Sequence, residues 1–400
     1  MVNSILDTDL YKFSVSYAYF KLYPLAEGTF EFKDRNNEDL RKCTSFVNCM
    51  QSAIINLQDL YLGDYELEWC VKNIPYIPQN YWEWLKGFRF DPNKVKMWLD
   101  ENGVFKCTVT DKLYKVTLYE IAILSLFSEV RNIYFVDKSN VVGDKVNIVD
   151  YVRETTRSKM KLASQKQIWF SEFGTRRRFS SRIHEIVLDE IAKKSNTCVG
   201  TSNVYYAMKH NMKPCGTFPH EWVMFHGAVF GYKRANYLSL EDWIKVYDGN
   251  LGIALVDTYT TKSFLHTLTR KQAHLLSGFR QDSGDEFEVG EMIISRLKEF
   301  GIDAKTKTIV FSNALDMEKA NKINDYFKDK VNVSFGIGTN LTCDINLKDY
   351  KPCNIVMKLM RCRISPKDEW EDCIKLSDDF GKHMGNKKEI EIAKHQLHIL

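Results

Sequence analysis

The stretch "LLSGFRQDSGDEFEVGEMIISRLKEFG", from Leu275 to Gly301, shows a pattern that recurs along the chain. A short apolar run ends in small and charged residues, and a longer segment with helical periodicity follows it. The next stretch, "KTIVFSNALDMEKANKINDYFKD" from Lys307 to Asp329, repeats this order. Strands that alternate with helices in this way predict parallel βα units.

Four further stretches begin with a similar apolar run and small polar residues, and most of them continue into a helical segment. They start at Thr197, Lys213, Leu251 and Val331. Six such units in succession favour an α/β fold built on an irregular (β/α) barrel. In a barrel the polar strand ends converge on one face, which is where barrel active sites lie. An open parallel sheet is the alternative that the pattern leaves open.

Length and composition predict a globular protein of two or three domains, because the chain has 400 residues of which 44% are hydrophobic. The 56 basic and 52 acidic residues nearly cancel, which argues against a module that binds nucleic acid through a broad basic face. We find neither an apolar run of about eighteen residues nor a signal peptide. The ten cysteines form no C-x-x-C pair, so we expect reduced thiols in a cytoplasmic protein.

Two histidines occur in "GTFPHEWVMFHGA", from Gly216 to Ala228. His220 and His226 are six positions apart, whereas zinc ligands on one helical face are four apart, so zinc binding is not predicted. His220 stands where a strand passes into a helix, which makes it a candidate functional residue. His226 lies inside an apolar helical stretch and is predicted to be structural.

Three other motifs indicate a small anionic ligand. The run Arg176–Arg178 precedes a helical segment, and both a helix N-terminus and guanidinium groups favour anions, although a solvated basic face is the simpler reading. Asp282 and Asp285 are candidate Mg²⁺ ligands, with substrate phosphates supplying the remaining oxygens. "FGIGTN", from Phe335 to Asn340, lacks the third glycine of a dinucleotide fingerprint and is interpreted as a phosphate-binding turn.

Ordered blocks along nearly the whole chain resemble the nicotinate phosphoribosyltransferase family. The blocks are "ILDTDLYKFSV", "FSEFGTRRRFS", "GTSNVYYA", "KPCGTFPHEWVM", "ALVDTY", "RQDSGD", "VFSNALDMEKA", "SFGIGTNLTCD", "IVMKLM" and "IKLSDDFGKHMG". The resemblance implies that residues 1–115 and 350–400 form a capping α/β domain over a barrel of residues 116–349. It also implies a homodimer with active sites shared between the subunits.

The same resemblance implies a reaction. Nicotinate and 5-phosphoribosyl 1-diphosphate would give nicotinate mononucleotide and diphosphate, as the first step of NAD salvage. ATP hydrolysis would be coupled through a phosphorylated His220, and Mg²⁺ would be required. Neither a membrane nor a nucleic acid is an expected partner. Nicotinamide phosphoribosyltransferase is the nearest alternative. A barrel aldolase or dehydrogenase is a more distant one, because this sequence lacks the Schiff-base context of the first and the third glycine of the second.

The resemblance also implies roles for single residues. Tyr11 would reach across the dimer to one face of the pyridine ring, and Phe173 would cover the other face. Thr217 and Arg280 would contact nicotinate. The other expected substrate contacts are Thr175, Arg176, Ser202, Asp282, Ser283, Gly336, Gly338 and Thr339.

Two positions differ among relatives. Many relatives carry Asp where Asn313 stands, so any contact of Asn313 with ribose or Mg²⁺ would lack a charge. Relatives that use the amide carry Asp where Ser202 stands. A neutral residue there removes repulsion from a ligand carboxylate and favours nicotinate.

Overall fold

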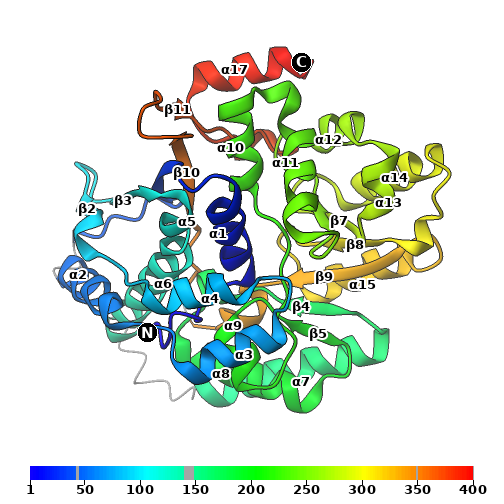
Figure 1. Ribbon diagram of the computed structural model, residues 1–400. Helices are drawn as coiled ribbons and strands as arrows, with labels where there is room; N and C mark the ends of the chain where they lie inside the picture. Colours follow the sequence, from blue (N-terminus) through cyan, green and yellow to red (C-terminus); the bar gives the residue numbers. More distant parts are fainter. Residues whose placement is uncertain (42–44, 139–147, 348–349, 400) are drawn as a thin grey trace.

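The computed structural model describes residues 1–41, 45–138, 148–347 and 350–399 (Figure 1). Two sheets organise the chain. The antiparallel sheet has the order β11-β10-β1-β3-β2 and consists of β1 (Glu27–Asp34), β2 (Val95–Leu99), β3 (Phe105–Lys112), β10 (Ile355–Arg363) and β11 (Glu371–Asp372). The parallel sheet has the order β5-β4-β9-β8-β7-β6 and consists of β4 (Phe170–Glu172), β5 (Cys198–Thr201), β6 (Ile253–Leu255), β7 (Gly278–Gln281), β8 (Thr308–Phe311) and β9 (Asn332–Ile337).

Helices cover both sheets. Those before the parallel sheet are α1 (Leu10–Leu22), α2 (Phe46–Asn56), α3 (Asp64–Asn73), α4 (Gln79–Gly87), α5 (Leu113–Val116), α6 (Tyr119–Lys138) and α7 (Ile148–Lys166). Those that follow β4 are α8 (Ser181–Lys194), α9 (Val204–Lys209), α10 (His220–Phe230), α11 (Tyr232–Tyr247), α12 (Thr261–Thr267), α13 (Arg270–Leu275), α14 (Glu286–Glu299), α15 (Met317–Phe327), α16 (Thr339–Thr342) and α17 (Lys387–Gln396). Within the described ranges, no helix is long and apolar enough to cross a membrane.

The parallel sheet has the connectivity of an irregular barrel. Its first strand, β4, pairs with both the second, β5, and the last, β9, and the remaining strands follow in sequence order. Over the described part of the chain, ladders join every neighbouring pair of this ring except β5 and β6. The α/β fold predicted from the repeated units is therefore confirmed, with one seam in the ring.

One predicted strand is wrong. The unit that starts at Lys213 forms only an isolated bridge between Pro214 and Thr201. Pro214 and Pro219 have no backbone N–H to donate to a ladder, so the segment stays extended beside β5 without becoming a strand. The parallel sheet still has six strands, because β4, which directly precedes Phe173, takes the place of the predicted strand.

The antiparallel sheet joins the two ends of the chain. β1 pairs with β10 from Glu27 opposite Arg363 to Asp34 opposite Ile355. Inward side chains such as Phe30 alternate with outward polar ones along β1. The expected cap likewise combined N-terminal and C-terminal segments; its exact limits stay a prediction, and residue 349 lies outside the described residues.

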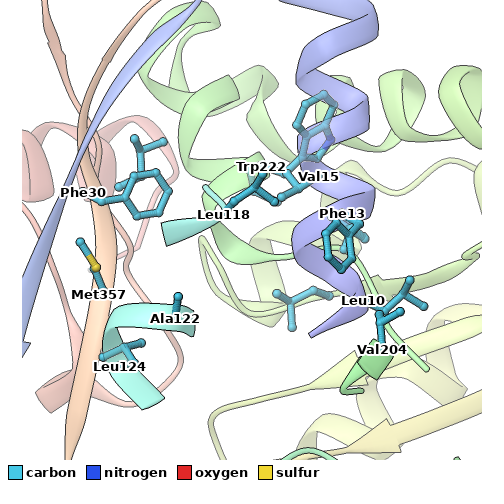
Figure 2. Packing of buried hydrophobic residues seen from close by; sticks show 14 of the residues in the cluster. Leu10, Phe13, Val15, Phe30, Leu118, Ala122, Leu124, Val204, Trp222 and Met357 are labelled. Carbon is cyan, nitrogen blue, oxygen red and sulfur yellow. The ribbon is translucent and has the colours of Figure 1, made fainter. Parts of the chain in front are cut away.

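Helix α1 lies between the two sheets and is almost entirely buried. Figure 2 shows how this core joins the two halves of the molecule, with side chains from α1, from the barrel side and from the antiparallel sheet: Leu10, Phe13, Val15, Val204, Trp222, Phe30 and Met357. Burying a large apolar side chain contributes about 1.5–3 kcal/mol. The N-terminal helix is thus fixed against its own barrel.

Candidate functional site

A cavity of about 570 Å³ lies where the C-terminal ends of the barrel strands face the antiparallel sheet. On the barrel side it is lined by residues that end or follow the strands, including Phe173, Ser202, Leu255, Arg280, Asp282, Ser312 and Gly338. On the other side it is lined by Arg35 after β1 and by Val356 and Lys358 of β10. The polar strand ends therefore converge as the repeated units predict.

This cavity brings together most of the residues selected from the sequence. They are Tyr11, Phe173, Arg176, Ser202, Thr217, His220, Arg280, Asp282, Asn313, Gly336, Gly338 and Thr339. These residues come from the N-terminal helix, five strand ends and the start of α10. Their common placement supports a single ligand site but leaves each role to be tested.

Three selected residues do not line the cavity. Thr175 is fully buried, and its hydroxyl accepts a hydrogen bond from Asn203 Nδ2 at 3.3 Å. Ser283 is also fully buried and donates to Asp257. Asp285 is exposed and caps α14, where its Oδ1 accepts from the backbone N–H of Phe287 and Glu288 at 2.9 Å each. The expected substrate contacts of the first two and the metal ligation by Asp285 stay predictions, and the structure places none of the three on this cavity.

His220 is the first residue of α10 and is held on both ring nitrogens. Nδ1 lies 2.9 Å from Thr258 Oγ1, and Nε2 lies 2.8 Å from Lys375 Nζ and 3.3 Å from Asp282 Oδ2. An ammonium group only donates, so Nε2 accepts from Lys375 and Nδ1 carries the proton that Thr258 accepts. This arrangement leaves the nitrogen next to Asp282 unprotonated.

The surroundings keep the His220 ring neutral. Burial and the neighbouring Lys375 lower the pKa of His220 to about 4, although Asp257 and Asp282 oppose this shift. His220 therefore has a free lone pair near neutral pH. Glu221, the next residue, does not orient this ring, because its carboxylate accepts from Lys12 and from Thr117 Oγ1. Thr258 orients the His220 ring instead, through its hydrogen bond with Nδ1.

His226 fulfils the structural role predicted from its apolar surroundings. It is fully buried in α10 and lies outside the cavity lining. Its Nδ1 donates to the Trp222 carbonyl at 2.7 Å, and its Nε2 lies 3.1 Å from Asp242 Oδ2. The ring is thereby fixed within the helical layer.

Arg280 is held in one orientation across the cavity floor. Its guanidinium donates to Ser312 Oγ at 2.9 Å, Thr217 Oγ1 at 3.0 Å and Asp282 Oδ1 at 3.1 Å. The same group lies 5.4 Å from the centre of the Phe173 ring. Although burial opposes ionisation, Arg280 and then His220 hold the pKa of Asp282 well below its usual range. A flat anionic ligand beside Phe173 would meet this fixed cation.

Tyr11 lines the cavity of its own chain. The segment before α1 is bound to the segment after β5, because Leu10 N–H donates to Ser202 O at 2.7 Å and Asp9 forms a bridge with Asn203. Tyr11 therefore lies on the same cavity as Phe173 without a second subunit. That Tyr11 also reaches the site of a partner chain stays a prediction.

Ser202 lies next to a second polar side chain, that of Asp9. Its hydroxyl donates to Asp9 Oδ1 at 2.8 Å, and both residues line the cavity. Burial, with Glu172 nearby, raises the pKa of Asp9 although Thr175, Ser202 and Arg176 oppose the shift. The Asp9 carboxylate thus lies beside the Ser202 hydroxyl at the cavity wall.

Oxygen ligands for a divalent cation are present beside His220. One ligand atom from each of His220, Asp257 and Asp282 lies within 4.8 Å of the others. Asp257 is fully buried, and its Oδ1 has no hydrogen-bond partner. Because Mg²⁺ prefers oxygen, Asp257 and Asp282 fit it better than His220, whose Nε2 is engaged by Lys375.

Several cavity or supporting residues were missed in the sequence. They are Arg35, Asp257, Thr258, Lys358 and Lys375. Asp257 and Thr258 follow β6 in "ALVDTY", so the rule of polar residues at strand ends identifies them in retrospect. Lys375 follows β11, a strand of the other sheet, and no pattern near it indicates contact with His220.

Comparisons with known proteins agree with this geometry. Residues 6–128 match the nicotinate phosphoribosyltransferase N-terminal domain, and residues 168–399 match the nicotinate phosphoribosyltransferase family. Two curated relatives are named nicotinate phosphoribosyltransferase. The one from Desulforapulum autotrophicum is 38% identical over 98% of this chain and 97% of its own length. The one from Chromohalobacter salexigens is 36% identical over 99% and 98%.

Solved structures give the same result. Nicotinate phosphoribosyltransferase from Porphyromonas gingivalis is 42% identical, with a TM-score of 0.95 over the full length of both chains. The enzyme of that name from Vibrio cholerae is 30% identical, with a TM-score of 0.90 over all of this chain and 95% of its own. The chain belongs to the nicotinate phosphoribosyltransferase family.

Proposed function

We propose that the protein transfers the 5-phosphoribosyl group of 5-phosphoribosyl 1-diphosphate to nicotinate and couples this reaction to ATP hydrolysis through a phosphohistidine at His220. The observation that carries the proposal is the neutral imidazole of His220, whose Nε2 lies between Lys375 and Asp282 on a cation-rich cavity. The product, nicotinate mononucleotide, is a precursor of NAD, so we assign the protein to NAD salvage in the cytoplasm.

Nicotinate fits between Tyr11 and Phe173. Two aromatic rings on one cavity favour a flat pyridine by about 0.5–1.5 kcal/mol per pair beyond the effect of area burial. Arg280 is placed to accept the carboxylate, because its guanidinium lies over Phe173 and is fixed by Thr217 and Ser312. Holding the ring in this position orients its nitrogen for attack.

Transfer itself is a displacement at the sugar C1 atom. The C1–O bond to diphosphate breaks, diphosphate leaves with the electron pair, and the pyridine nitrogen forms the new C1–N bond. The turn Gly336–Thr339 would hold the 5-phosphate, since its glycines allow close approach of backbone and ligand. The cations of the cavity offset the charge of the leaving group.

ATP would phosphorylate His220 on Nε2. The lone pair attacks the terminal phosphorus atom, the bond to the ADP oxygen breaks, and ADP leaves. Lys375 would then bind the new phosphoryl oxygens, while Thr258 keeps the ring in position through Nδ1. Mg²⁺, held by Asp257 and Asp282 when bound, would offset phosphate charge. A phosphate beside the substrate anions changes the local charge and thereby substrate affinity.

The two histidines provide the test. His220→Asn is expected to abolish acid-labile labelling by [γ-³²P]ATP and the stimulation by ATP, while some phosphoribosyl transfer remains. His226→Asn is the matched control in the same helix and should keep both. Labelling that survives in the first variant and disappears in the second would show that the wrong histidine was chosen.

The substrate is tested separately. Nicotinate, nicotinamide and quinolinate are supplied one at a time with 5-phosphoribosyl 1-diphosphate, and the products are separated by chromatography. Nicotinate mononucleotide is the expected product. Equal formation of nicotinamide mononucleotide would contradict the proposed substrate.

A further inference from the structure

Four charged side chains form a network beside the cavity, and three of them are buried. Lys12 of α1 is fully buried; its Nζ lies 2.5 Å from Oε2 of Glu120 in α6 and forms a second ion pair with Glu221 in α10. Lys358 Nζ of β10 lies 3.7 Å from Glu120 Oε1. Two ammonium groups thus face two carboxylates, and the network joins four elements that are far apart in the sequence.

The ammonium group of Lys12 has a partner for each of its three donors. Besides the two carboxylates, Lys12 Nζ donates to Thr117 Oγ1 at 3.1 Å, and Thr117 Oγ1 donates to Glu221 Oε1 at 2.6 Å. Although burial opposes ionisation, Glu120 and then Glu221 raise the pKa of Lys12. Lys12 is therefore a charged group that is held in one orientation.

The cost of burying these charges indicates a role beyond folding. Two ions that leave water lose hydration that their mutual attraction often fails to offset, and apolar side chains of similar volume can stabilise a fold as well. Glu120, Glu221 and Lys358 line the cavity, whereas Lys12 does not, so Lys12 has no direct contact with a ligand there. What Lys12 contributes to the site, it contributes through the side chains around it.

Both members of the Lys12–Glu221 pair adjoin a residue of the proposed reaction. Lys12 follows Tyr11, and its Nζ lies 5.1 Å from the centre of the Tyr11 ring, within the range of a cation–π contact. Glu221 follows His220 in the first turn of α10. Tyr11 and His220 line the same cavity. One buried ion pair therefore connects the helix that carries the stacking ring to the helix that carries the nucleophile.

We propose that Lys12 is a positioning residue, which holds the Tyr11 ring at the nicotinate site by binding α1 to Glu221 and Glu120. The inference rests on the proposed function. A ring stacks on a ligand only where it meets the face of that ligand, and a ring that is already held there loses no freedom when nicotinate binds. Lys12 thus acts on the affinity for nicotinate and not on the bonds that break.

A charge-balanced variant tests this role. Lys12→Met with Glu221→Gln removes one charge of each sign and leaves Glu120 paired with Lys358. Its KM for nicotinate should rise by about three- to tenfold, the effect of one lost stacking contact, while kcat and the labelling of His220 by ATP change much less.

A second ion pair provides the control. Arg157 Nε lies 2.8 Å from Glu190 Oε2 between α7 and α8, and neither residue lines the cavity. Arg157→Met with Glu190→Gln should keep the wild-type KM for nicotinate. Both double variants should melt close to the wild type, because uncharged side chains of similar size replace two opposite charges. Glu221→Gln alone keeps the bond from Lys12 to Glu120, so its KM should lie between those of the wild type and the Lys12 double variant.

The Tyr11→Ala background shows whether Lys12 acts through the ring. If it does, Lys12→Met with Glu221→Gln should raise the KM for nicotinate little further in a chain that already lacks the ring. A full additional rise in that background would mean that Lys12 acts elsewhere, and it would overturn the proposal. A double variant with the wild-type KM would overturn it as well.

Crystal structures separate this inference from the proposed function. The Tyr11 ring should leave the cavity in the variant with Lys12→Met and Glu221→Gln, and it should stay in place in the Arg157 control, whatever substrate the enzyme uses. If the ring moves but the wild-type protein transfers no phosphoribosyl group to nicotinate, the proposed function fails while the positioning role stands. An unmoved ring in a variant of an active enzyme gives the reverse result.

Discussion

The Nε2 atom of His220 has an ammonium group and a carboxylate as its neighbours. Lys375 Nζ lies at 2.8 Å and Asp282 Oδ2 at 3.3 Å. Burial and then Lys375 lower the pKa of the ring, and Asp282 is paired with Arg280, which limits its influence on the ring. A nucleophilic imidazole is thereby maintained in a site that is rich in carboxylates.

The pH dependence of His220 phosphorylation follows from this environment. Since the pKa of His220 is lowered to about 4, labelling by ATP should be nearly constant between about pH 5.5 and 8. Lys375→Gln removes the second cause of the shift while burial, the larger cause, remains, so its labelling should begin to decline at a higher pH than that of the wild type. Exposed Lys262→Gln serves as the control. Parallel pH profiles in the two variants would contradict the role of Lys375.

The same shift affects stability with a defined sign. The folded state binds the proton of His220 less readily than the unfolded state, so unfolding takes up a proton in this interval. The stabilisation from neutral His220 is complete above about pH 6.5 and is lost as the pH falls toward about 4. His220→Asn should therefore show a smaller loss of melting temperature across this range.

The Ser202 hydroxyl is hydrogen-bonded to the Asp9 carboxylate at the cavity wall. Ser202→Asp would place a second carboxylate beside Asp9 and repel the carboxylate of nicotinate, so kcat/KM for nicotinate should fall by about tenfold or more. Ser202→Asn is uncharged and should retain the preference for nicotinate over nicotinamide. Steady-state rates with both substrates check this, and an unchanged ratio in Ser202→Asp would remove Ser202 from the specificity determinants.

Residue types alone predicted some positions and not others. His220 and Arg280 were found because each occurs at a strand end, where a barrel collects its functional side chains. Asp285 meets the same condition, yet its carboxylate caps α14, since Asp suits an N-cap as well as it suits Mg²⁺. Lys375 reaches His220 across 155 residues, and such long-range contacts have no local signal.

The strand β9 and the turn after it shape the slot for the pyridine ring. A Cβ atom at Gly336 would lie 2.5 Å from the Phe173 ring, and one at Gly338 would lie 2.8 Å from the Phe173 carbonyl oxygen. The glycines of "FGIGTN" therefore let two strand ends approach each other. The sequence pattern identified a phosphate turn here, but it did not reveal that Gly336 also supports Phe173.

Gly336→Ala should displace the Phe173 ring. We expect a loss of about 1–3 kcal/mol in the free energy of unfolding, as for other overpacked sites, and a raised KM for nicotinate. Gly87→Ala is the matched control, because a Cβ atom there meets nothing within 4 Å. Chemical denaturation and steady-state kinetics measure both effects. A Gly336→Ala enzyme as stable as the control, with the same KM, would show that the ring does not rest on this glycine.

The alternation of strands and helices predicted the barrel because each unit had the same local order. It failed at the unit from Lys213, where apolar residues suggested a strand and two prolines prevented ladder pairing. Periodicity reports which residues are buried, but it does not report which backbone N–H groups find partners. The seam between β5 and β6 could therefore not be predicted.

Residues from distant parts of one chain meet at the cavity. Helix α1 is fixed by apolar burial and by hydrogen bonds to the segment after β5, so Tyr11 and Phe173 line one cavity. The family resemblance implied a shared site, and no feature of the N-terminal sequence indicates whether α1 packs on its own barrel.

Mixing inactive variants tests this arrangement. Tyr11→Ala and Arg280→Ala should each lose most activity, and a mixture unfolded and refolded together should stay inactive, since each chain lacks one residue of its only site. A mixture of either variant with wild type should show activity in proportion to the wild-type chains. Recovery of activity in the mixture of the two variants would mean that subunits exchange these residues.

The pairing of β1 with β10 also has a consequence during synthesis on the ribosome. β1 is made before the whole of the parallel sheet, whereas its partner from Ile355 to Arg363 and the Lys375 that binds His220 emerge only after that sheet. Until then, the nascent barrel has His220 without its ammonium partner and a cavity without its second wall. A chain that stops before β10 thus lacks one wall of the cavity and the hydrogen bond from Lys375 to His220.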